Sequence, residues 1–259
     1  MIRCPHSPRV PARSLIAIHL VALCAAALLG VSRPAVAQGA GAMTAPREAA
    51  KEEELPHPFF THMGLPEGVG NFNLRVLELA TRTDGTSDGD FAFHLETGLT
   101  RNIGLHIRND RFRTNEKTEA MFQYTALVSK DGMSGFAPII EFEFPTHAGA
   151  SRVNTLVGFT TSLGAPRWAF NQVLHYDPRE DMIDASAAIV LGASRTVFPV
   201  LEILGDGGQG RSTVVNVLAG FKVRLQDWLI GGVAVALPIT GFRDYASQVA
   251  VGPDFEWKR

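Results

Sequence analysis

Cysteine is nearly absent from this chain of 259 residues, and its two cysteines, Cys4 and Cys24, both lie close to the N-terminus. The rest of the chain therefore has neither a disulfide framework nor a thiol for catalysis. Beyond residue 38 it also lacks an apolar run long enough for a membrane-spanning helix, which needs about 20 residues. The most apolar later segment, 228–238, has only 11 residues. A soluble protein and a membrane β-barrel are the two classes left to separate.

Basic residues are scarce as well. Four of the 24 Lys and Arg residues precede residue 38 and no acidic residue does, so the rest of the chain has 20 basic and 26 acidic residues. A nucleic-acid-binding protein needs a basic stripe or patch. The sequence therefore predicts no nucleic-acid partner.

The first 37 residues have the pattern of a secretory signal peptide. Arg3, Arg9 and Arg13 supply a positive n-region, and an apolar run covers residues 15–30. Ala35-Val36-Ala37 then offers the small residues that signal peptidase accepts. The apolar run is shorter than a membrane anchor, so we predict that residues 1–37 are removed.

Residues 38–70 differ in character from the rest of the chain. Lys51-Glu52-Glu53-Glu54 is a charged run, and Pro56, Pro58 and Pro66 follow it. Three prolines so close together disfavour a long helix or a central strand. We predict a periplasmic N-terminal arm or plug.

A metal-binding arm is one alternative function. His57, His62 and Met63 lie within seven residues of one another. Imidazole and thioether together suit copper. The other interpretation is that these side chains only pack into the mouth of the fold.

From residue 71 onward, apolar and polar residues alternate in short runs that are separated by turn residues. In 91–99, for example, Phe91, Phe93 and Leu95 share one face, whereas His94 and Glu96 share the other. A period of two indicates strands with one apolar and one polar face. Twelve runs of this kind are expected, at 71–82, 90–100, 103–112, 117–129, 134–145, 151–162, 166–176, 181–193, 195–205, 211–223, 226–238 and 243–257.

Several features favour a transmembrane antiparallel up-and-down barrel of about 12 strands, at 71–259, over a secreted soluble β-protein. The connections alternate between longer and tighter ones, including 83–89 as a longer loop, as in outer-membrane barrels. Lys222 is the only lysine expected in mid-strand, whereas soluble strands are richer in lysine. Aromatic residues lie near strand ends, as in interfacial girdles, at Phe91, Phe112, Phe144, Trp168, Tyr176, Trp228, Phe242, Tyr245 and Trp257.

This fold predicts an outer-membrane location and two partners, the lipid of that membrane and the barrel-assembly machinery. The final strand ends in an aromatic residue, Trp257, and so resembles the signal that this machinery recognises, although Lys258 and Arg259 follow it.

Strand parity also predicts which side chains face the interior. Most of these would form an internal polar network, and the others would shape selectivity for a small-molecule solute. Because the charge is mildly acidic, cationic or neutral solutes are favoured over anions. The predicted lumen-lining residues are His94, Glu96, His106, Arg108, Glu141, Glu143, Asp184, Glu202 and Lys222.

Glycine residues are expected on the same interior faces. They either leave room for a plug or allow the sheet to bend. These glycines are Gly98, Gly104, Gly158, Gly192, Gly220 and Gly232.

A barrel-anchored hydrolase is a further alternative, because His175, Asp184 and Ser186 fall on neighbouring expected strands. No local signature supports a catalytic role for them. We therefore predict a protein that is not an enzyme, with no catalytic residue and no cofactor.

With its signal peptide, proline-rich arm, twelve short strands and terminal aromatic residue, the chain resembles the outer-membrane transporter and phenol meta-pathway-like channel family. The resemblance covers the barrel and lies in its architecture, so no functional residue is carried over. It implies passive passage of small, often aromatic, solutes. Narrow pores for oligosaccharides or nucleosides are alternatives.

Overall fold

A computed structural model describes residues 55–112, 117–146, 152–208, 210–241 and 245–258 of the chain. The predicted signal peptide and the first part of the arm, up to residue 54, lie outside the described residues. Within the described part, no helix is long and apolar enough to cross a membrane.

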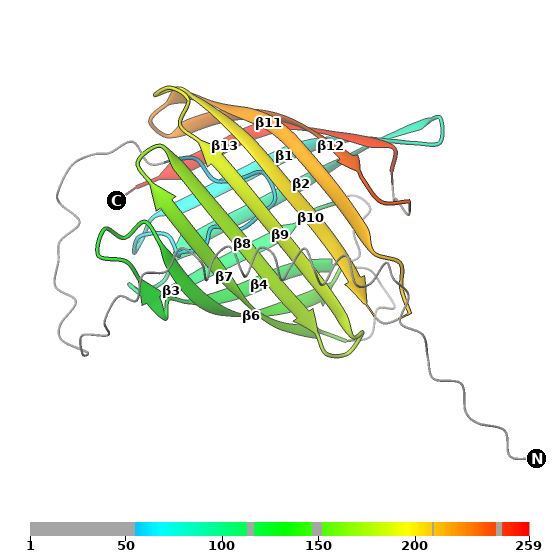
Figure 1. Cartoon of the computed structure of the whole chain (residues 1–259), viewed down its shortest axis with the longest axis horizontal. Helices are drawn as coiled ribbons and strands as arrows, with labels where there is room; N and C mark the ends of the chain where they lie inside the picture. The colour runs from blue at the N-terminus through cyan, green and yellow to red at the C-terminus, as the bar shows by residue number, and fades with distance from the viewer. Residues whose placement is uncertain (1–54, 113–116, 147–151, 209, 242–244, 259) are drawn as a thin grey trace, which may run out of the picture. The chain divides into compact units, whose positions relative to one another are not determined.

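The described residues form one antiparallel sheet that closes on itself (Figure 1). Successive strands pair with each other, except that β4 (Lys117–Tyr124) pairs with β6 (Gly135–Pro145) and not with β5 (Leu127–Val128), and the first strand, β1 (Phe72–Thr83), also pairs with the last, β13 (Ser247–Trp257). The strands are β1 (Phe72–Thr83), β2 (Thr86–Gly98), β3 (Ile103–Asn109), β4 (Lys117–Tyr124), β5 (Leu127–Val128), β6 (Gly135–Pro145), β7 (Asn154–Ala165), β8 (Trp168–Asp177), β9 (Met182–Leu191), β10 (Val197–Gly208), β11 (Val214–Gln226), β12 (Leu229–Pro238) and β13 (Ser247–Trp257).

β4 and the two-residue β5 are parts of one strand, because both pair with β6. Between them, the backbone N–H of Ala126 still donates to the carbonyl of Phe136, at 3.0 Å. The structure is therefore an all-β, twelve-stranded closed barrel. This confirms the predicted fold class, and the strands lie close to the predicted runs.

One predicted loop is wrong. Residues 83–89 were expected to form a long connection, but β1 and β2 pair up to Thr83 and Thr86. Asp84 and Gly85 form a two-residue turn with φ values of 42° and 89°. Two positive φ values in succession are typical of a type I′ hairpin turn, for which Asp-Gly is a preferred sequence. The polar residues that suggested a loop belong to the extended hairpin.

The exterior of the barrel is apolar. Side chains alternate between buried and exposed along most strands, and the exposed set is rich in leucine, valine, isoleucine and aromatic residues. Because the closed sheet pairs its backbone groups, this surface can face hydrocarbon. The molecule is thus a transmembrane barrel of the outer-membrane kind, as its sequence predicts.

Aromatic side chains gather near the strand ends. Trp257 stacks on Phe72 with ring centroids 5.1 Å apart, and Trp228 stacks on Phe255 at 6.3 Å. Of the predicted girdle, seven residues are exposed and Phe242 lies outside the described residues. Tyr245 is an exception, because it is buried in the interior. It precedes β13, so the alternation of that strand does not apply to it.

The lipid-facing orientation can be tested with two exposed leucines. Leu201 lies within β10 and Leu225 lies near the end of β11, and both side chains point outward. Leu201→Arg should lower the free energy of unfolding in lipid vesicles by about 2–4 kcal/mol, whereas Leu225→Arg should lower it by no more than about 1 kcal/mol. Urea titration measures both values. Equal, small effects at the two positions would contradict a membrane-embedded wall.

Candidate functional site

Residues 55–68 of the arm lie inside the barrel. Phe59 and Phe60 are buried in an apolar cluster that the wall provides. The interior is therefore only partly polar. Several strands have apolar residues on both faces. The cluster also contains Leu77, Leu79, Ala92, Val190, Phe198, Val200, Leu218, Ala234, Ala236, Tyr245 and Ala250.

The carboxylate of Glu202, on β10, binds the backbone of the arm. Its Oε2 accepts hydrogen bonds from the backbone N–H of Phe60 at 3.1 Å and of Thr61 at 2.8 Å. It also accepts one from the Thr61 hydroxyl at 3.0 Å, while Oε1 accepts one from the backbone N–H of Phe59. The arm forms no strand here, so its buried N–H groups need such acceptors. A single buried carboxylate satisfies three consecutive residues.

Two buried cations bind the carbonyl groups of the same turn. Arg75 on β1 donates to the Phe59 carbonyl at 2.7 Å. Lys222 on β11 donates to the Pro58 carbonyl at 3.1 Å and lies over the Phe59 ring, 4.7 Å from its centroid. Lys222 is also paired with Asp254 of β13. Charges of both signs on the wall thus hold the arm.

The second half of the arm is held by amides and a hydroxyl. Asn171 accepts a hydrogen bond from the backbone N–H of Gly64 at 3.0 Å, and Thr160 donates to the Gly64 carbonyl at 3.1 Å. Gln123 donates to the Met63 carbonyl at 3.2 Å. These side chains come from β8, β7 and β4, so the arm contacts the wall on several sides.

Glycines let the arm approach the wall closely. A Cβ atom on Gly104 would lie 2.8 Å from Pro66, and one on Gly232 would lie 2.8 Å from the Phe59 ring. A Cβ on Gly98 would collide with the carbonyl oxygen of Glu67. At Gly158 and Gly220, in contrast, a Cβ atom would meet the backbone of the adjacent strand. Gly98, Gly104 and Gly232 thus leave room for the arm, whereas Gly158 and Gly220 allow neighbouring strands to approach each other closely.

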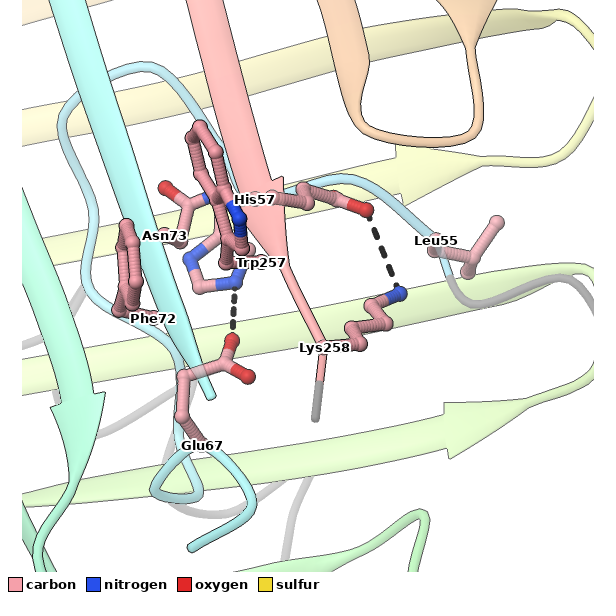
Figure 2. A pocket seen from close by; sticks show the side chains of 8 residues that line it. Leu55, His57, Glu67, Phe72, Asn73, Trp257 and Lys258 are labelled. Atoms are coloured by element: carbon pink, nitrogen blue, oxygen red, sulfur yellow. Dashed lines mark hydrogen bonds and ion pairs between the residues drawn. The ribbon is translucent and has the colours of Figure 1, made fainter. Parts of the chain in front are cut away.

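His57 is paired with two carboxylates at the mouth of the barrel. Its Nε2 lies 2.7 Å from Glu67 (Figure 2). Its Nδ1 lies 3.0 Å from Oε2 of Glu96. Burial alone would lower the pKa of His57, but the charges and hydrogen bonds of Glu96 and Glu67 outweigh it and raise the pKa to about 10. His57 is therefore positively charged at neutral pH and stabilises the arm in place.

A small cavity lies beside His57, as Figure 2 shows. Its volume is about 10 Å³, enough for about one water molecule and far below a typical ligand pocket. Phe72, Asn73, Trp257 and Lys258 help to line it. The cavity itself is thus no binding site for a solute.

All nine predicted lumen-lining residues lie on the interior side of their strands. His94, Glu96 and His106 are buried, as are Glu141, Glu202 and Lys222. Arg108, Glu143 and Asp184 are half-buried.

The register of β2 and β3 places Glu96 opposite His106 and His94 opposite Arg108. Opposite residues are not always ion partners, however. His94 contacts Asp110 at 2.6 Å, and Arg108 pairs with Glu119.

The predicted set of lumen-lining residues omits three interior residues that matter for the site, Arg75, Glu119 and Gln123. Arg75 shares a face with Asn73, opposite the apolar Phe72, Leu74 and Val76, so the alternation at the start of β1 could have placed it inside. The strict alternation of Met121, Phe122 and Gln123 could have placed Gln123 inside. Strand parity also places Glu119 inside, two residues before Met121.

The structure does not bring His57 and His62 of the predicted metal-binding arm together. His62 lies 3.1 Å from His106, whereas His57 pairs with Glu67 and Glu96. The potential ligands that the structure groups around His62 thus come from the wall and not from His57.

For the hydrolase alternative, His175 lies opposite Asp184 in the register, and Ser186 lies opposite Val173. Among the described residues, no hydrogen bond joins Ser186 to His175. His175 Nε2 instead lies 3.5 Å from Glu141. The geometry does not support a nucleophile and its base.

Comparisons with known proteins give a fold and no family. No protein-family model and no curated protein matches the chain. A solved structure described as "KdgM porin" is similar, with a TM-score of 0.54 and 10% identity over 71% of this chain and 99% of that one. A second, "KdgM porin in complex with disordered oligogalacturonate", gives a TM-score of 0.53 and 9% identity over 73% and 99%. The chain therefore has a porin-like barrel fold, which agrees with its lipid-facing exterior and with a location in the outer membrane.

Proposed function

We propose that this protein is an outer-membrane channel for small solutes whose interior is closed by its own arm. The observation that carries the proposal is the way in which the arm is held. It fills the interior through side-chain contacts. Among the described residues, its only β-bridge to the wall is an isolated one from Val69, near the end of the arm, to Gly98. The arm can leave without breaking the closed sheet.

The charge of the wall favours neutral or cationic solutes. Its buried acidic residues include Glu96, Glu141, Glu202 and Asp254, whereas Arg75 and Lys222 are the fully buried basic residues of the described chain other than histidine. A ring of carboxylates selects against anions. When the arm leaves, the wall also exposes apolar side chains next to these charges. This combination suits small aromatic solutes, in agreement with the resemblance seen in the sequence.

A reversible lock on the arm tests the proposal. Pro66 and Gly104 face each other, since a Cβ atom on Gly104 would lie 2.8 Å from that of Pro66. A disulfide needs about 3.8 Å between the two Cβ atoms, so Pro66→Cys with Gly104→Cys should join the arm to β3 after a shift of about 1 Å. Cys4 and Cys24 are replaced by serine to exclude other pairings.

Solute uptake is then measured by swelling of proteoliposomes in small neutral sugars and phenols. We expect uptake at least as fast as wild type from the reduced double variant, in which two free thiols crowd the docked arm, and at least 10-fold slower uptake from the oxidised one. The Pro66→Cys single variant controls for the substitution and should not respond to oxidant. Equal uptake by both redox forms would contradict a closing arm, and no uptake by the wild-type protein would contradict a channel.

A further inference from the structure

Three buried side chains direct potential metal ligands toward one point inside the barrel. His62 belongs to the arm, Glu96 to β2 and His106 to β3. One ligand atom of each lies within 4.8 Å of the other two. Each side chain is at least 98% buried. Any ion bound here would link the arm directly to the wall.

The distances within this group fit a tetrahedral metal site. His62 Nδ1 lies 3.1 Å from His106 Nδ1, and His106 Nδ1 lies 3.5 Å from Glu96 Oε2. In a tetrahedral zinc site with bonds of about 2.0–2.2 Å, neighbouring ligand atoms lie about 3.3–3.6 Å apart. The two pairs that include His106 thus already have nearly the spacing that such an ion requires, and His62 and Glu96 lie within 4.8 Å of each other.

Hydrogen bonds determine which ring nitrogen of His106 carries the proton. Gln123 donates through its Nε2 to Thr160 Oγ1 at 2.8 Å and to the Met63 carbonyl at 3.2 Å. Its Oε1 must then accept the hydrogen bond from His106 Nε2, at 3.0 Å. In neutral His106 the proton is then on Nε2 and the lone pair is on Nδ1, which faces His62 and Glu96. A metal-binding histidine is usually oriented in this way, by a hydrogen bond from its other ring nitrogen.

Glu96 is oriented by a similar arrangement. Its Oε1 accepts a hydrogen bond from Arg75 at 2.8 Å. Its Oε2 lies 3.0 Å from Nδ1 of His57 and 3.5 Å from Nδ1 of His106. It is the atom that faces His106.

We propose that His62, Glu96 and His106 bind a divalent cation of the zinc class, which tethers the arm to β2 and β3. Two imidazole nitrogens and one carboxylate oxygen are ligands that zinc takes, with a water molecule at the fourth position. This proposal does not depend on transport, because it concerns binding in the closed barrel.

The other acidic group of the interior, Glu119, Glu141 and Glu143, does not make an equivalent site. Arg108 pairs with Glu119, and Lys117 pairs with Glu143. The group also contains no histidine, so it lacks the imidazole ligands that the proposed site offers to zinc.

Calorimetric titration of the refolded full chain, with Cys4 and Cys24 replaced by serine, tests the proposal. It is done in detergent with zinc chloride, after chelator treatment and dialysis. We expect one zinc ion per chain with a Kd below about 10 μM. His62→Ala and His106→Ala should each weaken binding at least 100-fold. Cobalt should bind at the same site and give the visible absorption bands of a tetrahedral ion.

The matched control is His175→Ala, because His175 is also a buried wall histidine but lies outside the group. It should bind zinc as tightly as the wild-type protein. Heat-dependent gel migration shows whether each variant is folded. If His106→Ala does not fold, the result for His62→Ala alone tests the proposal, because His62 belongs to the arm and not to the wall. The absence of saturable binding at micromolar zinc, or binding that survives His62→Ala, would overturn the proposal.

Discussion

Glu202→Gln should shift the arm from its closed position and raise the open probability of the channel in planar bilayers about 100-fold. The substitution keeps the shape of the side chain and removes its charge. An amide group has only one acceptor atom. Its N–H₂ group is a donor and cannot accept hydrogen bonds from the N–H groups of the arm. Hydrogen bonds to a charged group contribute about 1.5–3 kcal/mol each, so a loss of about 3 kcal/mol is expected. Each 1.4 kcal/mol changes an equilibrium about 10-fold.

Chymotrypsin provides a second measurement of the same shift. It cleaves after Phe59 and Phe60, which are buried in the docked arm and become accessible when the arm leaves. Cleavage at these sites, identified by mass spectrometry, should be about 100-fold faster in Glu202→Gln. Asp184→Asn is the matched control, because Asp184 also faces the interior but makes no described contact with the arm. If the two variants open and are cleaved at the same rates, Glu202 is not what holds the arm.

The sequence predicts the barrel well because the barrel depends on a local signal. Each strand shows its own period of two, so the alternation of Phe122, Gln123 and Tyr124 is enough to assign both faces. The register of one hairpin, such as Glu96 with His106, follows from the length of its turn. The loop predicted between β1 and β2 was wrong because polar residues outweighed the Asp84-Gly85 turn signal.

The arrangement of the interior could not be predicted in the same way. Glu202 is separated by 141 residues from Thr61, which it binds, and no periodic pattern relates the two positions. Tyr245 was placed on the exterior by parity, although β13 begins only at Ser247. Phe198 and Leu218 are apolar residues that face inward, where the pattern favours polar ones. Their burial makes sense only once the two phenylalanines of the arm are known to pack against them.

Lys222→Met should be the most destabilising single substitution in the wall. Lys222 and Asp254 are both buried and paired with each other. Methionine fills a similar volume but leaves the Asp254 carboxylate buried without its cation. Removing one partner of a buried ion pair lowers the free energy of unfolding by about 3–5 kcal/mol. Urea unfolding in lipid vesicles, followed by the fluorescence of the chain's three tryptophans, measures the loss.

The double variant Lys222→Met with Asp254→Leu separates the contribution of the ion pair to stability from that of side-chain packing. Replacing both members of a buried pair by apolar residues of similar size is often neutral, so most of the lost stability should return. Recovery should stop about 1 kcal/mol short of wild type, because the Pro58 carbonyl also loses the hydrogen bond from Lys222. That remaining loss belongs to the arm and should appear as faster chymotrypsin cleavage after Phe59. A double variant as unstable as Lys222→Met alone would mean that the lysine acts through packing, and the wall charges would then not be what keeps the arm inside.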